Sequence, residues 1–130
     1  MPAGPGYVIA FDFGLRHIGV AAGQTVTASA SPLTTLKARD GKPDWPALLD
    51  LVRPWQPHTL IVGLPLNMDD SESGMSERAR AFAAALARRT GIVTVLVDER
   101  LTTRAAREQH GDHAEAAVLI AETWLHDNAG

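Results

Sequence analysis

The sequence predicts an α/β domain with a mixed sheet, and two features of its apolar pattern indicate this class. The first 36 residues contain short β-rich segments joined by short links, which is typical of an antiparallel meander. After residue 44, helical segments alternate with short continuous apolar runs, which is the pattern of parallel strands with helices on the sheet faces. We therefore expect a five-stranded mixed sheet flanked by helices, with residues 1–130 forming one domain.

The meander is expected to contain three strands. YVIAFDF (residues 7–13) is apolar and β-rich, and HIGVAAG (residues 17–23) follows it after a glycine turn. A third, more exposed strand is expected within residues 25–36. Pro32 interrupts this segment and cannot donate a backbone hydrogen bond, so the third strand is expected near an edge of the sheet.

The second part of the chain is expected to alternate helices and strands. Asp44 can cap a helix whose first turn holds Pro46, and two later apolar runs are expected to be strands buried on both faces. The expected order is a helix from Asp44 to Pro57, a strand over 59–65, a helix over 75–89 with Ala79, Phe82, Ala83 and Leu86 inward and Gly91 as its stop, a strand over 92–97, a short helix after Thr102 or Thr103, and a last helix over 112–126.

Composition excludes several classes of protein. There is no cysteine, so disulfides and thiolate metal sites are excluded, and no apolar run is long enough to span a membrane. The N-terminus lacks the features of a signal peptide, so a cytoplasmic location is expected. The net charge of −3 is not typical of a nucleic-acid-binding protein, but seven of the twelve basic residues are arginines between Arg78 and Arg107. They suit phosphate binding, or they line a solvated helix face.

Polar side chains follow the apolar strands at three places: Asp12, residues 63–67 and residues 98–100. Ligands of α/β sheets gather beyond the carboxyl ends of parallel strands. A buried Asp12 needs a metal, a cation or hydrogen bonds, and turn amides around Gly14 are the structural alternative. The small residues of the 17–23 strand leave room for a phosphate or a metal. Glu99 and Asp98 close their strand, with a surface ion pair to Arg100 as the alternative interpretation.

A third acidic cluster precedes the last helix. Asp112 and Glu115 are three residues apart, which fits either metal ligation or an N-terminal capping pattern, and His110 and His113 lie beside them. Carboxylates from three different elements can hold two Mg²⁺ or Mn²⁺ ions, which activate water and stabilise the leaving oxygen in phosphodiester hydrolysis. No Ser-His-Asp pattern or Walker loop offers a competing chemistry.

Five segments together resemble the YqgF (RuvX) family. They are AFDFGLRHIGVAAG, IVGLPLNMDDSE, SERARAF, VDERLTT and AAVLIAETWL, which occur in this order from about residue 7 to residue 126. The resemblance implies an RNase H-like fold, a relationship to Holliday junction resolvases, and a role in maturing the 5′ end of 16S ribosomal RNA. It also implies that Asp12 is the first-strand metal carboxylate and that Glu99 of VDER is the second.

The third carboxylate departs from the family pattern. The family has an aspartate just before the final alanine-rich helix, and counting back from Trp124 without a gap places His113 there, with Asp112 one residue earlier. We expect Asp112 to be the third ligand, because a hard divalent cation prefers oxygen, with His113 or Glu115 as alternatives. Phosphate contacts are expected from residues that flank these carboxylates in sequence, namely Arg16, Asn67, Arg100 and Arg104.

The expected function is a metal-dependent nuclease, a hydrolase that acts on structured RNA and has DNA junctions as a second substrate. Ribosomal particles are expected partners, and no membrane is involved. An actin-like ATPase module also has a D-x-G-x4-G turn, but such proteins need two domains of this kind. The altered third cluster and the acidic balance leave a third interpretation, a non-catalytic RNA- or ribosome-binding factor on the same fold.

Overall fold

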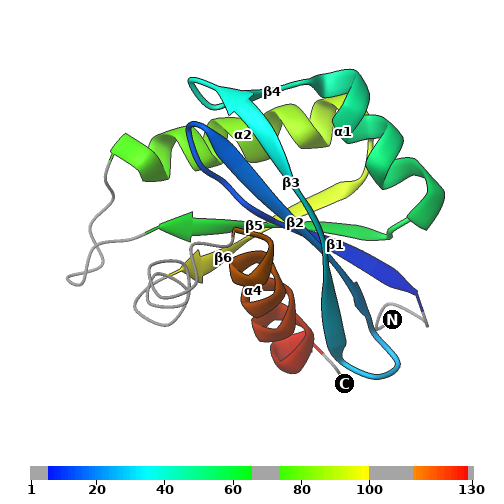
Figure 1. Cartoon of the computed structure of the whole chain (residues 1–130). Helices are drawn as coiled ribbons and strands as arrows, with labels where there is room; N and C mark the ends of the chain where they lie inside the picture. The colour runs from blue at the N-terminus through cyan, green and yellow to red at the C-terminus, as the bar shows by residue number, and fades with distance from the viewer. Residues whose placement is uncertain (1–5, 66–73, 100–112, 129–130) are drawn as a thin grey trace.

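The computed structural model describes residues 6–65, 74–99 and 113–128. Its centre is a six-stranded sheet in the order β4-β3-β2-β1-β5-β6, with helices on both faces (Figure 1). The strands are β1 (Tyr7–Asp12), β2 (His17–Gln24), β3 (Ser29–Arg39), β4 (Lys42–Pro43), β5 (Thr59–Pro65) and β6 (Val93–Glu99).

The expected antiparallel meander is confirmed. β1 pairs with β2, which places Asp12 opposite Gly19, and β2 pairs with β3. The register shifts between Val20, which lies opposite Thr34, and Ala21, which lies opposite Pro32, so β3 carries a bulge at Leu33, next to the proline. Only the two residues of β4 pair on the outer side of β3, which confirms that the third strand lies near the sheet edge.

The expected number of strands was wrong by one, because the link between β3 and the first helix forms a hairpin. Arg39 pairs with Lys42, and the two residues between them have left-handed backbones, with φ of 51° at Asp40 and 79° at Gly41. Asp-Gly is the favoured sequence for such a two-residue turn. β4 is too short for its residues to show any alternation of polarity, so only the turn could have revealed it.

The parallel half of the sheet brings three strand ends to one edge. β1 and β5 are parallel, as are β5 and β6, so their carboxyl ends point the same way.

The second apolar run was expected to be buried on both faces, and this expectation was wrong for β6. Val93 is 64% exposed, because β6 is the last strand of the sheet in the described part of the chain.

α2 and α4 closely match their expected ranges, whereas α1 begins at its expected cap and ends before the expected Pro57. α1 (Trp45–Val52) is capped by Asp44, whose side chain accepts a 3.2 Å hydrogen bond from the backbone N–H of Ala47. It continues as the 3₁₀ turn η1 (Arg53–Trp55), which ends at the left-handed Gln56. The other described helices are α2 (Gly74–Thr90), stopped by the left-handed Gly91, and α4 (His113–Asn128). The helix expected after Thr102 lies outside the described residues.

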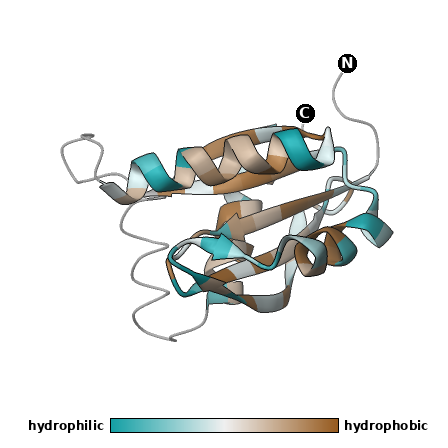
Figure 2. Cartoon of the chain, turned by 90° about the horizontal axis from the view of Figure 1, so that it is seen from above, coloured by the Kyte–Doolittle hydropathy of each residue, from teal (hydrophilic) through white to brown (hydrophobic). Residues whose placement is uncertain are grey.

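The helices form two layers around the sheet. α1 and α2 cover one face and α4 crosses the other, and in Figure 2 apolar residues mark the surfaces between the layers. On the α2 side Phe11 packs edge-to-face against Phe82, and the four α2 residues expected to face inward are all buried. On the α4 side a second cluster forms between α4 and the strands, from Val8, Ala10, Ile61, Ile120, Ala121 and Leu125. None of the described helices is both long enough and apolar enough to cross a membrane.

Candidate active site

Asp12 is a fully buried carboxylate at the carboxyl end of β1. Side chains alternate along a strand, so Asp12 lies on the same face as Val8 and Ala10, which is the face covered by α4. A buried carboxylate loses its hydration and must be compensated by hydrogen bonds or cations. One partner is the imidazole of His113, whose Nδ1 lies 3.0 Å from Oδ2 of Asp12.

His113 is the first residue of α4, and two contacts hold its ring. In addition to the contact with Asp12, the ring stacks on His17 at the start of β2, with a centroid distance of 5.6 Å and an interplanar angle of 26°. The His113 side chain remains 24% exposed, so it forms the boundary between the buried carboxylate and solvent. The structure therefore brings His113, one of the alternatives for the third ligand, into contact with Asp12.

Gly19 allows the start of α4 to approach β2. A Cβ atom at Gly19 would lie 1.9 Å from the carbonyl oxygen of His113 and 2.6 Å from the nitrogen of Ala114, so no other residue fits without a shift of backbone. The small residues of β2 were expected to leave room for a phosphate or a metal. At Gly19 the backbone of α4 takes that space, and this close packing fixes the position of His113 over Asp12.

The backbone brings position 99 to the same end of the sheet as Asp12. β5 lies between β1 and β6, and the register across β5 aligns Phe11 of β1 with Leu96 of β6. Position 99 is the last residue of β6. The side chain of Glu99 itself lies outside the described residues.

The other expected site residues divide into two groups. Arg16 is exposed in the link between β1 and β2, next to the edge where Asp12 lies, and Glu115 is exposed in the first turn of α4. Four expected residues lie outside the described parts of the chain, namely Asn67, Arg100, Arg104 and Asp112. Sequence reasoning missed His17, because a histidine at the start of a strand carries no signal until its tertiary neighbour is known.

The chemistry of these donors fits a divalent cation. A carboxylate oxygen is a ligand for both Mg²⁺ and Mn²⁺, and imidazole nitrogen is acceptable to Mn²⁺. Among the side chains that the structure describes, no group of three or more His, Asp or Glu converges, and the closest pair is Asp12 with His113. Asp12 can therefore supply one ligand of a metal site, and its contact with His113 restrains the position of its carboxylate.

Comparison with solved structures identifies the fold as RNase H-like. The RuvC of Thermus thermophilus in complex with a Holliday junction substrate aligns with a TM-score of 0.58 at 13% identity, over 95% of this chain and 96% of that chain. A fowlpox virus resolvase in complex with Holliday junction DNA aligns with a TM-score of 0.52 at 10% identity, over 93% and 97% of the two chains. At these identities the likeness concerns the fold alone.

Comparison of sequences identifies the family. A protein of Nitrosococcus oceani named as a pre-16S rRNA nuclease is 50% identical, over 95% of this chain and 89% of its own length. One of Acinetobacter baylyi with the same name is 46% identical, over 90% and 88% of the two chains. The family model RuvX, described as Holliday junction resolvase, matches residues 6–127. The chain therefore belongs to the RuvX family.

Proposed function

We propose that this protein is a metal-dependent nuclease that hydrolyses phosphodiester bonds during processing of the 5′ end of pre-16S ribosomal RNA. The observation that carries the proposal is the fully buried carboxylate of Asp12 at the edge where the parallel strands end. Burying this charge costs folding free energy. A residue with a purely structural role at this position would not need to carry a charge. The names of the relatives, which are 46–50% identical, support the choice of substrate.

In this proposal Asp12, Glu99 and Asp112 hold Mg²⁺ or Mn²⁺. Two such cations, when bound, activate a water molecule and stabilise the leaving oxygen of the phosphodiester. Asp12 supplies a rigid carboxylate, because it is buried and because His113 contacts one of its oxygens at 3.0 Å. In this proposal His113 orients Asp12 through this contact, as a hydrogen-bond partner of a ligand commonly does.

The substrate is proposed to be held by Arg16, Asn67, Arg100 and Arg104. Arg16 supports this assignment, because it is exposed and lies four residues after Asp12 in the turn beside it. An arginine can make two parallel hydrogen bonds to a phosphate group and so fixes its orientation as well as its charge. The protein is proposed to act in the cytoplasm, with precursor ribosomal particles as its partners.

A second candidate function is cleavage of DNA junctions. It is favoured by the description of the matching family model as Holliday junction resolvase. The same metal and carboxylates would serve both substrates, because the reacting group is a phosphodiester in each case. A third candidate, a factor that binds RNA without cutting it, would retain binding and lack hydrolysis.

Cleavage assays with purified protein test these alternatives. We expect cleavage of a precursor RNA that carries a 5′ extension, in Mg²⁺ or Mn²⁺, and no cleavage in excess EDTA or by the Asp12→Asn variant. A labelled four-way DNA junction tested in parallel distinguishes the two substrates. Cleavage that survives both chelation and Asp12→Asn would exclude the metal mechanism, and tight RNA binding without cleavage under all conditions would establish the non-catalytic factor.

A further inference from the structure

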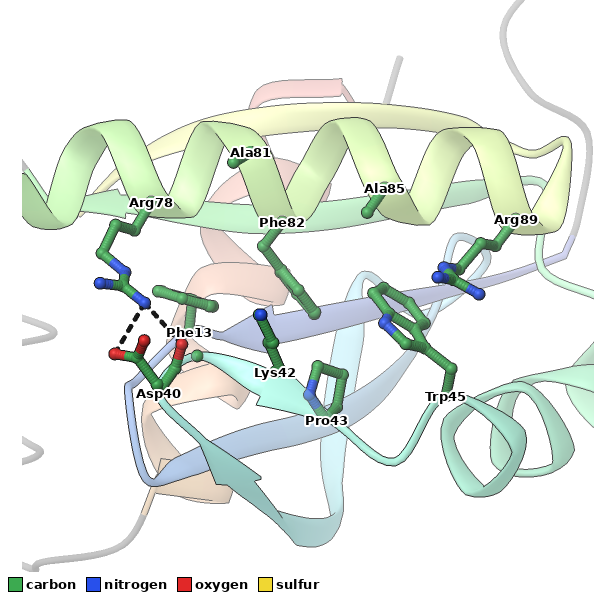
Figure 3. Close-up of a pocket in the computed structure, with 11 residues that line it drawn as sticks. Phe13, Asp40, Lys42, Pro43, Trp45, Arg78, Ala81, Phe82, Ala85 and Arg89 are labelled. Atoms are coloured by element: carbon green, nitrogen blue, oxygen red, sulfur yellow. Dashed lines mark hydrogen bonds and ion pairs between the residues drawn. The ribbon is translucent and has the colours of Figure 1, made fainter.

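A cavity lies on the face of the sheet opposite α4. Figure 3 shows it between α2 and the β3–β4 hairpin, and its volume is about 590 Å³. Cavities of this size accommodate small molecules or single groups of a polymer. No residue of the candidate active site lines this cavity, so the cavity is separate from that site and can have a different role.

Aromatic side chains form the apolar part of the cavity. The ring of Phe82 packs on Phe13 with a centroid distance of 5.2 Å and stacks on Trp45 with a distance of 5.8 Å and an interplanar angle of 26°. Phe13 and Phe82 are buried, whereas Trp45 is half-buried. The exposed aromatic surface of the cavity therefore comes mainly from the indole of Trp45.

One wall of the cavity is preformed by the hairpin turn. The guanidinium of Arg78 pairs with the carboxylate of Asp40 at 2.9 Å and also donates to its backbone carbonyl (Figure 3). A Cβ atom at Gly41 would lie 2.9 Å from the Phe13 ring and 3.3 Å from the Arg78 guanidinium. Arg78, which belongs to α2, therefore uses its guanidinium to hold the hairpin turn against this helix.

Two other cations remain available to a ligand. The guanidinium of Arg89 lies 4.5 Å above the Trp45 ring, and Lys42 is exposed at the rim. Neither Lys42 nor Arg89 forms an ion pair with any of the residues that the structure describes. α2 also carries four arginines and one glutamate, although the whole chain has a net charge of −3. This separation of charge raises the local concentration of anionic ligands.

We propose that this cavity binds an unpaired nucleotide of the RNA substrate. The Arg89 guanidinium over the Trp45 ring places a cation directly beside an aromatic surface, and unpaired bases stack on aromatic rings and on arginine planes. Lys42 and Arg89 can bind the phosphates on either side of that base. An acidic peptide would satisfy the same cations, but it lacks a planar base attached to two phosphates.

The position of the cavity links it to the candidate active site, and this step depends on the proposed nuclease function. Phe13 directly follows Asp12, and the two side chains lie on opposite faces at the carboxyl end of β1. A strand of RNA that passes Asp12 can cross this end of β1 and enter the cavity. The preferred substrate then has an unpaired segment that extends from the scissile phosphate along the cavity, because Trp45 and Arg89 lie at the opposite end of the cavity from Phe13 (Figure 3).

The test measures binding separately from cleavage. The affinity of the Asp12→Asn protein for a fluorescein-labelled single-stranded oligoribonucleotide is measured by anisotropy in EDTA, where the proposed hydrolysis cannot occur. We expect Arg89→Ala and Trp45→Leu each to weaken binding about tenfold, as for the loss of one stacked base. Arg88→Ala is the matched control, because Arg88 is an exposed arginine on the same helix that does not line the cavity. Thermal melting by circular dichroism verifies that each variant is folded.

Three outcomes would overturn the proposal. Equal losses in Arg88→Ala and Arg89→Ala would indicate general attraction to α2, and unchanged affinity in Arg89→Ala and Trp45→Leu would show that RNA does not use the cavity. Arg89-dependent binding of a labelled peptide rich in glutamate and phenylalanine, without such binding of RNA, would assign the cavity to a protein partner. Failure of the nuclease proposal appears instead as absent cleavage by the wild-type protein and leaves the binding comparison intact.

Discussion

Nδ1 of His113 lies 3.0 Å from Oδ2 of Asp12, although 101 positions separate the two residues in the chain. The contact joins the last helix to the first strand at the edge where β1, β5 and β6 end. The site proposed for phosphodiester hydrolysis therefore depends on how α4 is seated on the sheet, and this dependence leads to the first prediction.

Removal of the His113 side chain should impair cleavage without abolishing it. His113→Ala removes the group that orients Asp12, and loss of such a partner typically lowers activity about 10- to 100-fold. Asp112→Asn should lower cleavage by a larger factor, because a neutral amide is a poor substitute for a metal-binding carboxylate. Rates at saturating metal and the metal concentration for half-maximal rate measure both effects. If His113→Ala is as inactive as Asp12→Asn while Asp112→Asn is active, His113 is the third ligand.

Divalent metal should stabilise the wild-type protein against heat. A ligand that binds only the folded state adds about 2.7 kcal/mol at a concentration of one hundred times its Kd. Melting temperatures in Mn²⁺ and in EDTA should therefore differ for the wild type and coincide for Asp12→Asn. Glu122→Gln is a suitable control, because Glu122 lies in the middle of α4, away from the strand ends. An equal rise in melting temperature for Asp12→Asn would place the metal elsewhere.

A methyl group at Gly19 should destabilise the fold. Gly19→Ala puts a carbon 1.9 Å from the His113 carbonyl oxygen and forces α4 away from β2, at a cost of about 3 kcal/mol. Gly74→Ala is the matched control, because among the described residues nothing beyond its chain neighbours and the backbone of its own helix lies within 4 Å of the added carbon, and the backbone there is helical. Urea denaturation measures both. Equal midpoints for the two variants would contradict the close packing of α4 on Gly19.

Arg16 should contribute one phosphate contact. Arg16→Ala is expected to weaken RNA binding and to lower by about one the slope of log affinity against log salt concentration. Arg53→Ala is the control, because Arg53 is an exposed arginine that already pairs with Asp50 at 2.9 Å, beyond the end of α1. Identical salt slopes for the wild type and Arg16→Ala would remove Arg16 from the substrate contacts.

Periodicity and capping predicted most of the fold. The caps at Asp44 and Gly91 and the buried face of α2 were identified because each depends on neighbours within a few residues. β4 was missed because a strand of two residues is too short to show an alternation of polarity. The sequence Asp40-Gly41 is nevertheless typical of a tight turn. The exposure of β6 was misjudged because an apolar run does not reveal whether another strand lies beside it.

Of the three carboxylates predicted for the site, Asp12 is the one whose side chain the structure describes. Asp12 stood out because a charge within an apolar strand is costly, and it is indeed buried. His113 was one of three alternatives for the third ligand, with Asp112 favoured, and its contact with Asp12 was not predicted. The stacking of His17 on His113 and the fit of α4 on Gly19 depend on tertiary packing, which local sequence does not encode.

The seating of α4 on the first two strands also determines when the site can form during translation. Chains are synthesised from the N-terminus, so Asp12 leaves the ribosome about a hundred residues before His113 does. Until then, the face of β1 and β2 that α4 covers stays open, and Asp12 lacks its histidine partner. A chain that stops before α4 can pair its strands but cannot complete this edge. Formation of the proposed nuclease site therefore has to wait until α4 has been synthesised and has packed on the sheet.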